Sequence, residues 1–144
     1  MRSGEMMAKV EKTNAGEYEI ERKNRELAIL AALTMHEQRA EDVVILDLRA
    51  LVDYADFFVI GSAASLTRMR GVARMVEKRL GKAGGRRLNQ SEKDNGWVLA
   101  DFGDILVHVF DKEAREFYRL EDLWGDAPMV DWEDRIAAKD GARG

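Results

Sequence analysis

The chain has 144 residues and a formal net charge of −4, and its 46% hydrophobic and 35% charged residues are typical of one globular domain. It contains no cysteine, which excludes disulfides and thiolate metal sites, and no apolar run approaches the roughly 18 residues of a membrane helix. Glutamates recur through the first 21 residues, which argues against an acid-poor transit peptide, so we expect a cytoplasmic protein.

Residues 1–23 are polar, mixed in charge and without periodicity, so we expect a flexible leader there. Asn24 is predicted to cap a helix that begins near Arg25 and extends to about Arg39. Its core-facing positions recur at helical spacing and are Leu27, Leu30, Ala31, Thr34 and Met35.

Two strands and a second helix are predicted next. Residues 42–48 form a short apolar run of strand length, and Phe57–Ile60 is apolar on both faces, as expected of a central strand. Gly61-Ser62 ends this strand, and Ser65 is predicted to cap a long helix that stops at Gly84-Gly85. The buried stripe of that helix comprises Leu66, Met69, Val72, Ala73, Val76, Leu80 and Ala83.

A β-hairpin is predicted between Asn95 and Phe110, with Leu88 as the start of a short strand before it. Two apolar runs flank a polar segment in which Gly103 supplies the positive φ of a tight turn. A Phe102-Gly103 loop would place Asp101 opposite Asp104, Leu99 opposite Leu106, and Trp97 opposite His108. The other face is apolar throughout and predicts the core: Val98, Ala100, Ile105, Val107 and Val109.

The polar face of this hairpin predicts a partner-binding surface. It has an indole, an imidazole and two carboxylates that would repel each other if they were directly opposed. For His108, packing against Trp97 and a role in the interface both stay open, but neither a zinc site nor a catalytic triad can be assembled around it. The predicted surface comprises Trp97, Leu99, Asp101, Asp104, Leu106 and His108.

Asp111 is predicted to cap a further helix, with Gly125 as its stop signal and residues 129–144 as a loosely held tail. The apolar positions of this helix are Ala114, Phe117, Tyr118 and Leu120. The element order α-β-β-α-β-β-α predicts an α+β fold, in which residues 24–128 form one mixed sheet of four or five strands flanked by helices.

Charge is distributed unevenly along the chain. Residues 65–93 contain 9 basic and 2 acidic residues, net +7, whereas residues 101–134 contain 3 basic and 11 acidic residues, net −8. These blocks are either solvated faces or surfaces that steer association with a partner made of basic protein and nucleic acid. Basic residues recur at every fourth position of the second helix and form a basic stripe: Arg70, Arg74, Lys78 and Lys82. They are either candidate contacts to RNA phosphates or a solvated helix face. The stripe lacks the interleaved aromatic residues of base-specific RNA binding.

Two motifs suggest enzymes but are incomplete. Gly61-Ser62 before a helix is suited to bind phosphate and is similar to the Gly-Ser of nucleotidyltransferase folds. The magnesium-binding carboxylate pair that those enzymes need is missing from residues 70–76. Asp101-Phe102-Gly103 matches the kinase tripeptide in letters only, since no other kinase motif accompanies it. We therefore predict neither a cofactor nor a metal.

The segment YADFFVIGSAAS, the hairpin, and REFYRLEDLWGDA closely resemble the ribosomal silencing factor family, also called RsfS or Iojap, over about Glu26 to Pro128. The matching positions are Trp97-Val98-Leu99, Asp101, Gly103-Asp104, His108 and Leu123-Trp124-Gly125. GSAAS departs from the family pattern, which more often has Thr and Ser after the glycine. The resemblance implies a nucleotidyltransferase-like topology without the catalytic carboxylates.

The resemblance also implies a non-enzymatic translation factor. Such a protein binds the large ribosomal subunit through its protein number fourteen on the intersubunit face, blocks joining of the small subunit, and lowers translation when nutrients are scarce. A nucleotidyltransferase-fold enzyme and a generic RNA-binding module are the alternatives. A homodimer of the free protein, paired through a sheet edge or the hairpin face, stays open.

Overall fold

A computed structural model describes residues 3–86, 89–93 and 96–136 of the chain. Helix α1 (Ser3–Glu37) precedes strands β1 (Glu41–Asp47) and β2 (Phe57–Ser62), and helix α2 (Leu66–Lys82) follows them. The remaining elements are β3 (Asn89–Lys93), β4 (Trp97–Asp101), β5 (Ile105–Phe110), α3 (Lys112–Tyr118) and α4 (Leu120–Leu123).

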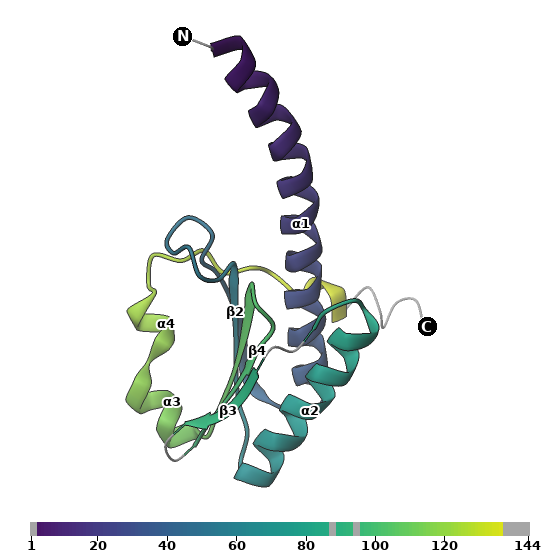
Figure 1. Ribbon diagram of the computed structural model, residues 1–144. Coiled ribbons are helices and arrows are strands. Elements are labelled where there is room, and N and C mark those ends of the chain that lie inside the picture. The colour runs from purple at the N-terminus through teal and green to yellow at the C-terminus, as the bar shows by residue number, and fades with distance from the viewer. Residues whose placement is uncertain (1–2, 87–88, 94–95, 137–144) are drawn as a thin grey trace.

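The strands form one mixed sheet in the order β1-β2-β5-β4-β3. β2 and β5 pair in parallel at its centre, and the other neighbours are antiparallel. This arrangement confirms the predicted α+β fold with a four- to five-stranded mixed sheet. Figure 1 shows α1 and α2 on one side of the sheet and α3 and α4 on the other.

The main core lies between the sheet and the helices α1 and α2. The hairpin side chains on this side are at most 1% exposed, which confirms the predicted core face: Val98, Ala100, Ile105, Val107 and Val109. A second, smaller core lies under α3 and α4, where Phe58, Ile60 and Phe110 pack against Ala114 and Leu120. The sheet is thus covered on both faces at its centre.

Helix α1 begins at Ser3, so the predicted helix start near Arg25 is wrong. Asn24 is no cap but a buried residue inside the helix. The N-terminal part of α1 projects beyond the sheet in Figure 1, and residues 3–23 therefore continue the helix rather than form a separate leader. A polar sequence without hydrophobic periodicity does not exclude a helix, but it offers no pattern from which a helix can be predicted.

The other two predicted helix caps, Ser65 and Asp111, are confirmed. The Ser65 hydroxyl accepts a hydrogen bond from the Arg68 backbone N–H at 3.2 Å, and an Asp111 carboxylate oxygen accepts one from the Ala114 N–H at 2.7 Å. Gly84 takes a positive φ of 92° just after α2, as its predicted stop requires.

The β4–β5 hairpin has a register two residues away from the predicted one. Trp97 pairs with Phe110, Leu99 with His108, and Asp101 with Leu106. Gly103 takes the predicted positive φ, 86°, but the turn is longer than Phe102-Gly103. Because a shift of two residues preserves which face each side chain occupies, the division into a core face and a polar face survives the error.

Residues 129–136 are attached to the edge of the sheet, which corrects the predicted loose tail. The Val130 N–H donates to the Ile45 carbonyl at 3.0 Å, and the Trp132 indole N–H donates to the Val43 carbonyl at 3.2 Å. Trp132 is only 6% exposed. Residues 137–144 of the predicted tail, and Leu88, lie outside the described residues.

Among the described residues, no helix is long and apolar enough to span a membrane.

Candidate docking surface

His108 is a buried strand residue held by Trp97. The Trp97 indole N–H donates to His108 Nδ1 at 3.1 Å, so the histidine proton lies on Nε2 when the ring is neutral. His108 is 3% exposed, and burial lowers its pKa to about 3. Among the described side chains, its Nε2 is a buried nitrogen without a hydrogen-bond partner. His108 is therefore not an exposed part of the predicted surface. Its side chain lies in the interior and accepts the hydrogen bond that orients Trp97.

Aromatic rings connect Trp97 to the surface of the molecule. The Trp97 ring lies 4.9 Å from that of Phe110 and 4.7 Å from that of Tyr118 on α3, measured between centroids. Tyr118 in turn meets Phe117 edge-on at 5.1 Å, and Phe117 is 79% exposed. Trp97 is half-buried as a result, and the outermost ring of this aromatic run belongs to α3.

The position of α3 depends on a close contact between two backbone segments. The Asp111 N–H donates to the Gly96 carbonyl at 2.9 Å, and a Cβ on Gly96 would lie 2.2 Å from an Asp111 carboxylate oxygen. Gly96 also has a φ of 100°, which favours glycine. This glycine lets the Asp111 cap sit directly above the start of β4, which brings Tyr118 over Trp97.

The rest of the predicted face is half-buried and remains accessible beside α3. Leu99 and Leu106 share the side of Trp97, as the alternation along β4 and β5 requires. Asp101 lies on the same side, where one of its carboxylate oxygens accepts the Gly103 backbone N–H at 2.8 Å. Asp101 therefore stabilises the turn and still leaves a carboxylate at the rim of this surface.

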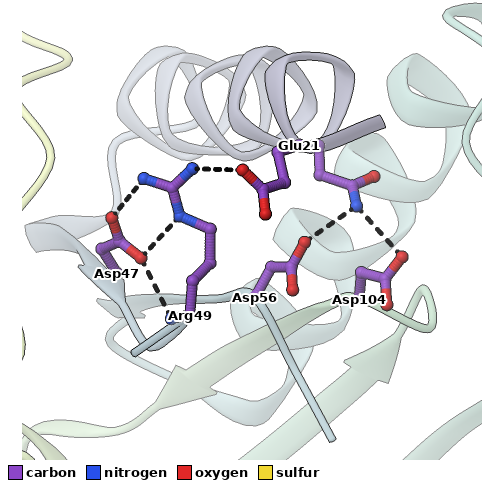
Figure 2. A network of polar contacts seen from close by, with 6 residues as sticks. Glu21, Asp47, Arg49, Asp56 and Asp104 are labelled. Atoms are coloured by element: carbon purple, nitrogen blue, oxygen red, sulfur yellow. Dashed lines mark hydrogen bonds and ion pairs between the residues drawn. The ribbon is translucent and has the colours of Figure 1, made fainter. Parts of the chain in front are cut away.

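Asp104 points to the opposite side of the sheet, which corrects its predicted place on the docking face. The Asn24 amide donates to Asp104 at 3.0 Å and to Asp56 at 3.1 Å. Figure 2 shows these two carboxylates near each other. Burial raises the pKa of Asp56, and the charges of Asp104 and Glu21 raise it further. Asp104 lies in the turn rather than in a strand, so strand alternation does not determine its direction.

Gly61-Ser62 forms the last two residues of β2 rather than a phosphate-binding loop. The Ser62 hydroxyl is 7% exposed and accepts a hydrogen bond from the Arg115 guanidinium at 3.1 Å. A Cβ on Gly61 would lie 2.5 Å from the terminal methyl of Met35, so this glycine lets α1 approach the sheet closely. Within the described part of the chain, no three His, Asp or Glu side chains are placed to hold a metal ion.

Phe117 is a surface residue that the sequence pattern placed among apolar helix positions. The buried Ala114 and the half-buried Tyr118 lie four residues apart on one side of α3, which leaves Phe117 facing outward. Arg119 then takes a left-handed conformation with a φ of 46° and separates α3 from α4. Leu123 on α4 is 68% exposed as well. The spacing of Ala114 and Tyr118 is the signal that identifies Phe117 as exposed.

The two sides of the sheet differ in charge. Helices α3 and α4 and their caps contain exposed acidic side chains next to Phe117 and Leu123: Glu113, Glu116 and Asp122. Helix α2, on the opposite side in Figure 1, has the exposed basic stripe. Part of the uneven charge along the sequence is therefore a difference between the acidic helices α3 and α4 and the basic helix α2.

The family model described as "Ribosomal silencing factor during starvation" matches residues 21–144. The chain belongs to this family. The ribosomal silencing factor of Halalkalibacterium halodurans is 40% identical over 116 residues, which cover 79% of this chain and 98% of that protein. The factor of Bacillus subtilis is 38% identical over 103 residues, which cover 71% of this chain and 87% of that protein. These matches confirm the family that the sequence motifs indicated.

Solved structures similar to this silencing factor confirm its fold. A crystal structure of a Chromobacterium violaceum protein matches with a TM-score of 0.66 at 27% identity, over 70% of this chain and 85% of that one. A crystal structure of a Bacillus halodurans protein matches with a TM-score of 0.63 at 33% identity, over 74% of this chain and 98% of that one. The chloroplastic protein Iojap of Arabidopsis thaliana is 32% identical over 72% of this chain and 44% of its own length. Family membership places this chain in ribosome silencing and translation regulation.

Proposed function

We propose that this silencing factor binds the large ribosomal subunit at its protein number fourteen, blocks joining of the small subunit, and represses translation under nutrient limitation. Family membership supports ribosome silencing, and a mouse relative, 27% identical over 110 residues, is named for assembly of the mitochondrial large ribosomal subunit. The aromatic run that leads from Trp97 to the exposed Phe117 is the observation that supports an interface on this side of the sheet.

The docking face, as we define it, comprises Trp97, Leu99, Asp101, Leu106, Phe117 and Tyr118. A few residues supply most of the binding energy in protein interfaces, and tryptophan and tyrosine are frequent among them. Phenylalanine is also enriched at interfaces relative to the rest of the surface. Phe117 is the exposed anchor, and Trp97 and Tyr118 form the rigid support beneath it. Acidic side chains such as Glu113 and Glu116 flank the anchor and are suited to a basic ribosomal protein.

The proposal is tested by mixing the protein with separated ribosomal subunits and measuring the fraction of assembled ribosomes on a sucrose gradient. The wild type should lower this fraction. The variant with Phe117→Ser and Leu99→Lys should lose the effect, because it removes the exposed ring and places a cation in the apolar part of the docking face. Both side chains reach the surface, so the fold should persist.

Met129→Ser is the matched control. Met129 is 65% exposed, like Phe117 a large apolar side chain in solvent, but it lies at the β1 edge beside Leu46. This variant should block subunit joining as well as the wild type does. Full activity of the Phe117→Ser, Leu99→Lys variant would show that the docking face lies elsewhere.

A further inference from the structure

Helix α2 has a charge that its own stability does not explain. Between Leu66 and Lys82 it contains six Lys and Arg against Glu77 alone, net +5, so the rest of the chain amounts to −9. Its first turn has no acidic residue, although the helix dipole favours one there. Like charges four residues apart on a helix repel each other, so the basic stripe destabilises the helix that presents it.

Arg68 and Arg79 connect α2 to the neighbouring helix. The Arg68 guanidinium donates to the Gln38 carbonyl at 2.9 Å, and Arg79 pairs with Glu37, so both attach α2 to the end of α1. The others are exposed along the outer side of the helix: Arg70, Arg74, Lys78 and Lys82. Exposed Lys23 of α1, which lies beside Gly84, and exposed Arg86 extend the basic surface past the end of α2.

We propose that this basic stripe binds the phosphates of ribosomal RNA, as a second contact on the side of the sheet opposite the docking face. The inference rests on the proposed function, since the large subunit supplies both the protein and the RNA. Side chains four residues apart on a helix are separated by about 6 Å along its axis. That spacing is close to the distance between consecutive phosphates of one nucleic-acid strand.

RNA suits the stripe better than an acidic protein does. Protein interfaces depend on aromatic and large apolar anchors, and the stripe from Arg70 to Lys82 presents none of them to solvent. Phosphate binding needs only charge and hydrogen-bond donors, which guanidinium and ammonium groups supply. Because no aromatic residue stands among the basic ones, the contact reads no base sequence.

The experiment measures binding of the full-length protein to purified large subunits over a series of salt concentrations. The variant with Arg74→Gln, Lys78→Gln and Lys82→Gln should bind more weakly at low salt. The slope of log K against log salt should fall by about 2, because each lost phosphate contact removes roughly 0.7 to 0.9 from it. Thermal unfolding of this variant should occur no lower than in the wild type, since repulsion within α2 is relieved.

A second triple variant, with Arg22→Gln, Arg39→Gln and Lys112→Gln, is the matched control. These residues are exposed and scattered, so the net charge changes equally while the basic stripe stays intact. It should retain most of the wild-type salt slope. Equal slopes in the two triple variants would overturn the proposed RNA contact.

Binding to the isolated ribosomal protein number fourteen separates this inference from the proposed function. The stripe variant should bind that protein as tightly as the wild type does, whereas the Phe117→Ser, Leu99→Lys variant should not bind it. Loss of this binding in the stripe variant would mean that the stripe contacts protein, which refutes an RNA contact. Failure of the wild type to bind either the protein or the subunit would refute both proposals.

Discussion

At the scale of single residues, His108 shows how a polar side chain can serve a binding surface without being part of it. Its Nδ1 accepts the Trp97 indole N–H, and its ring lies 4.5 Å from that of Phe58. Burying the ring is compatible with folding only in the neutral form, because desolvation penalises the imidazolium. The orientation of Trp97 therefore depends on the protonation state of a residue that is itself buried.

This burial predicts a pH dependence of stability. The pKa of His108 is lowered from its ordinary 6.5 to about 3 in the folded protein, so between these values the unfolded chain binds a proton that the native state does not. The free energy of unfolding should then fall by about 2 kcal/mol between about pH 7 and pH 5 from this residue alone. Urea unfolding of the wild type and of His108→Gln, which keeps an acceptor for Trp97, measures this contribution. Parallel pH profiles of the two proteins would contradict it.

At the scale of elements, helix α3 is short and depends on its ends for its position. Arg115 fixes one side of it by donating to Ser62 at 3.1 Å and to Glu121 at 3.2 Å. Asp111 caps the N-terminus and accepts the Ala114 N–H. Helices of seven residues are not stable by themselves, so these contacts, together with Tyr118, decide whether α3 stays over Trp97.

Removing the cap should therefore loosen the docking face more than it unfolds the protein. Asp111→Ala should lower the free energy of unfolding by about 1 kcal/mol, the usual effect of losing a helix N-cap. Hydrogen exchange of the α3 amides should accelerate more than that of β2 or β5, and Trp97 fluorescence should shift toward that of an exposed indole. Asp111→Asn keeps the capping oxygen, so its α3 hydrogen exchange and its Trp97 fluorescence should be close to those of the wild type. Unchanged α3 exchange in Asp111→Ala would contradict this role.

The same elements show what could be predicted from the sequence. The alternation of Val98, Ala100 and Val107 identified the core face, because burial on one side of a strand requires period two. The hairpin register was missed, because it depends on the turn length rather than on the pattern. The direction of Asp104 was missed because it is determined by Asn24, which is 80 residues away in the sequence. The exposure of Phe117 was missed because the sequence pattern counted every apolar position of α3 as buried, whereas only the side with Ala114 and Tyr118 faces the core.

At the scale of the whole molecule, the segment after Pro128 packs against α1 and β1 and contributes to the main core. Trp132 packs into the main core next to Val43, and Arg135 binds Glu26 of α1 through two hydrogen bonds of 2.9 Å. This ion pair lowers the pKa of Glu26. It is solvent-exposed, so its contribution to stability is small beside that of the buried indole.

Trp132→Ala should therefore destabilise the protein by about 3 to 5 kcal/mol, because it leaves a cavity in the main core and orphans the Val43 carbonyl. Arg135→Ala should cost less than about 1 kcal/mol. Chemical denaturation of the two variants gives both values. Similar losses would indicate that the segment is held by charge rather than by the indole.

The parallel pair at the centre of the sheet also has a consequence for how the chain folds during its own synthesis. β2 ends at Ser62 and β5 begins at Ile105, so α2, β3 and β4 must all be made before the central pair can form. Contacts between such distant segments slow folding, because a large loop must close first. A nascent chain that stops short of β5 has the apolar strand β2 paired with β1 alone, and its other edge stays open to aggregation until β5 is made.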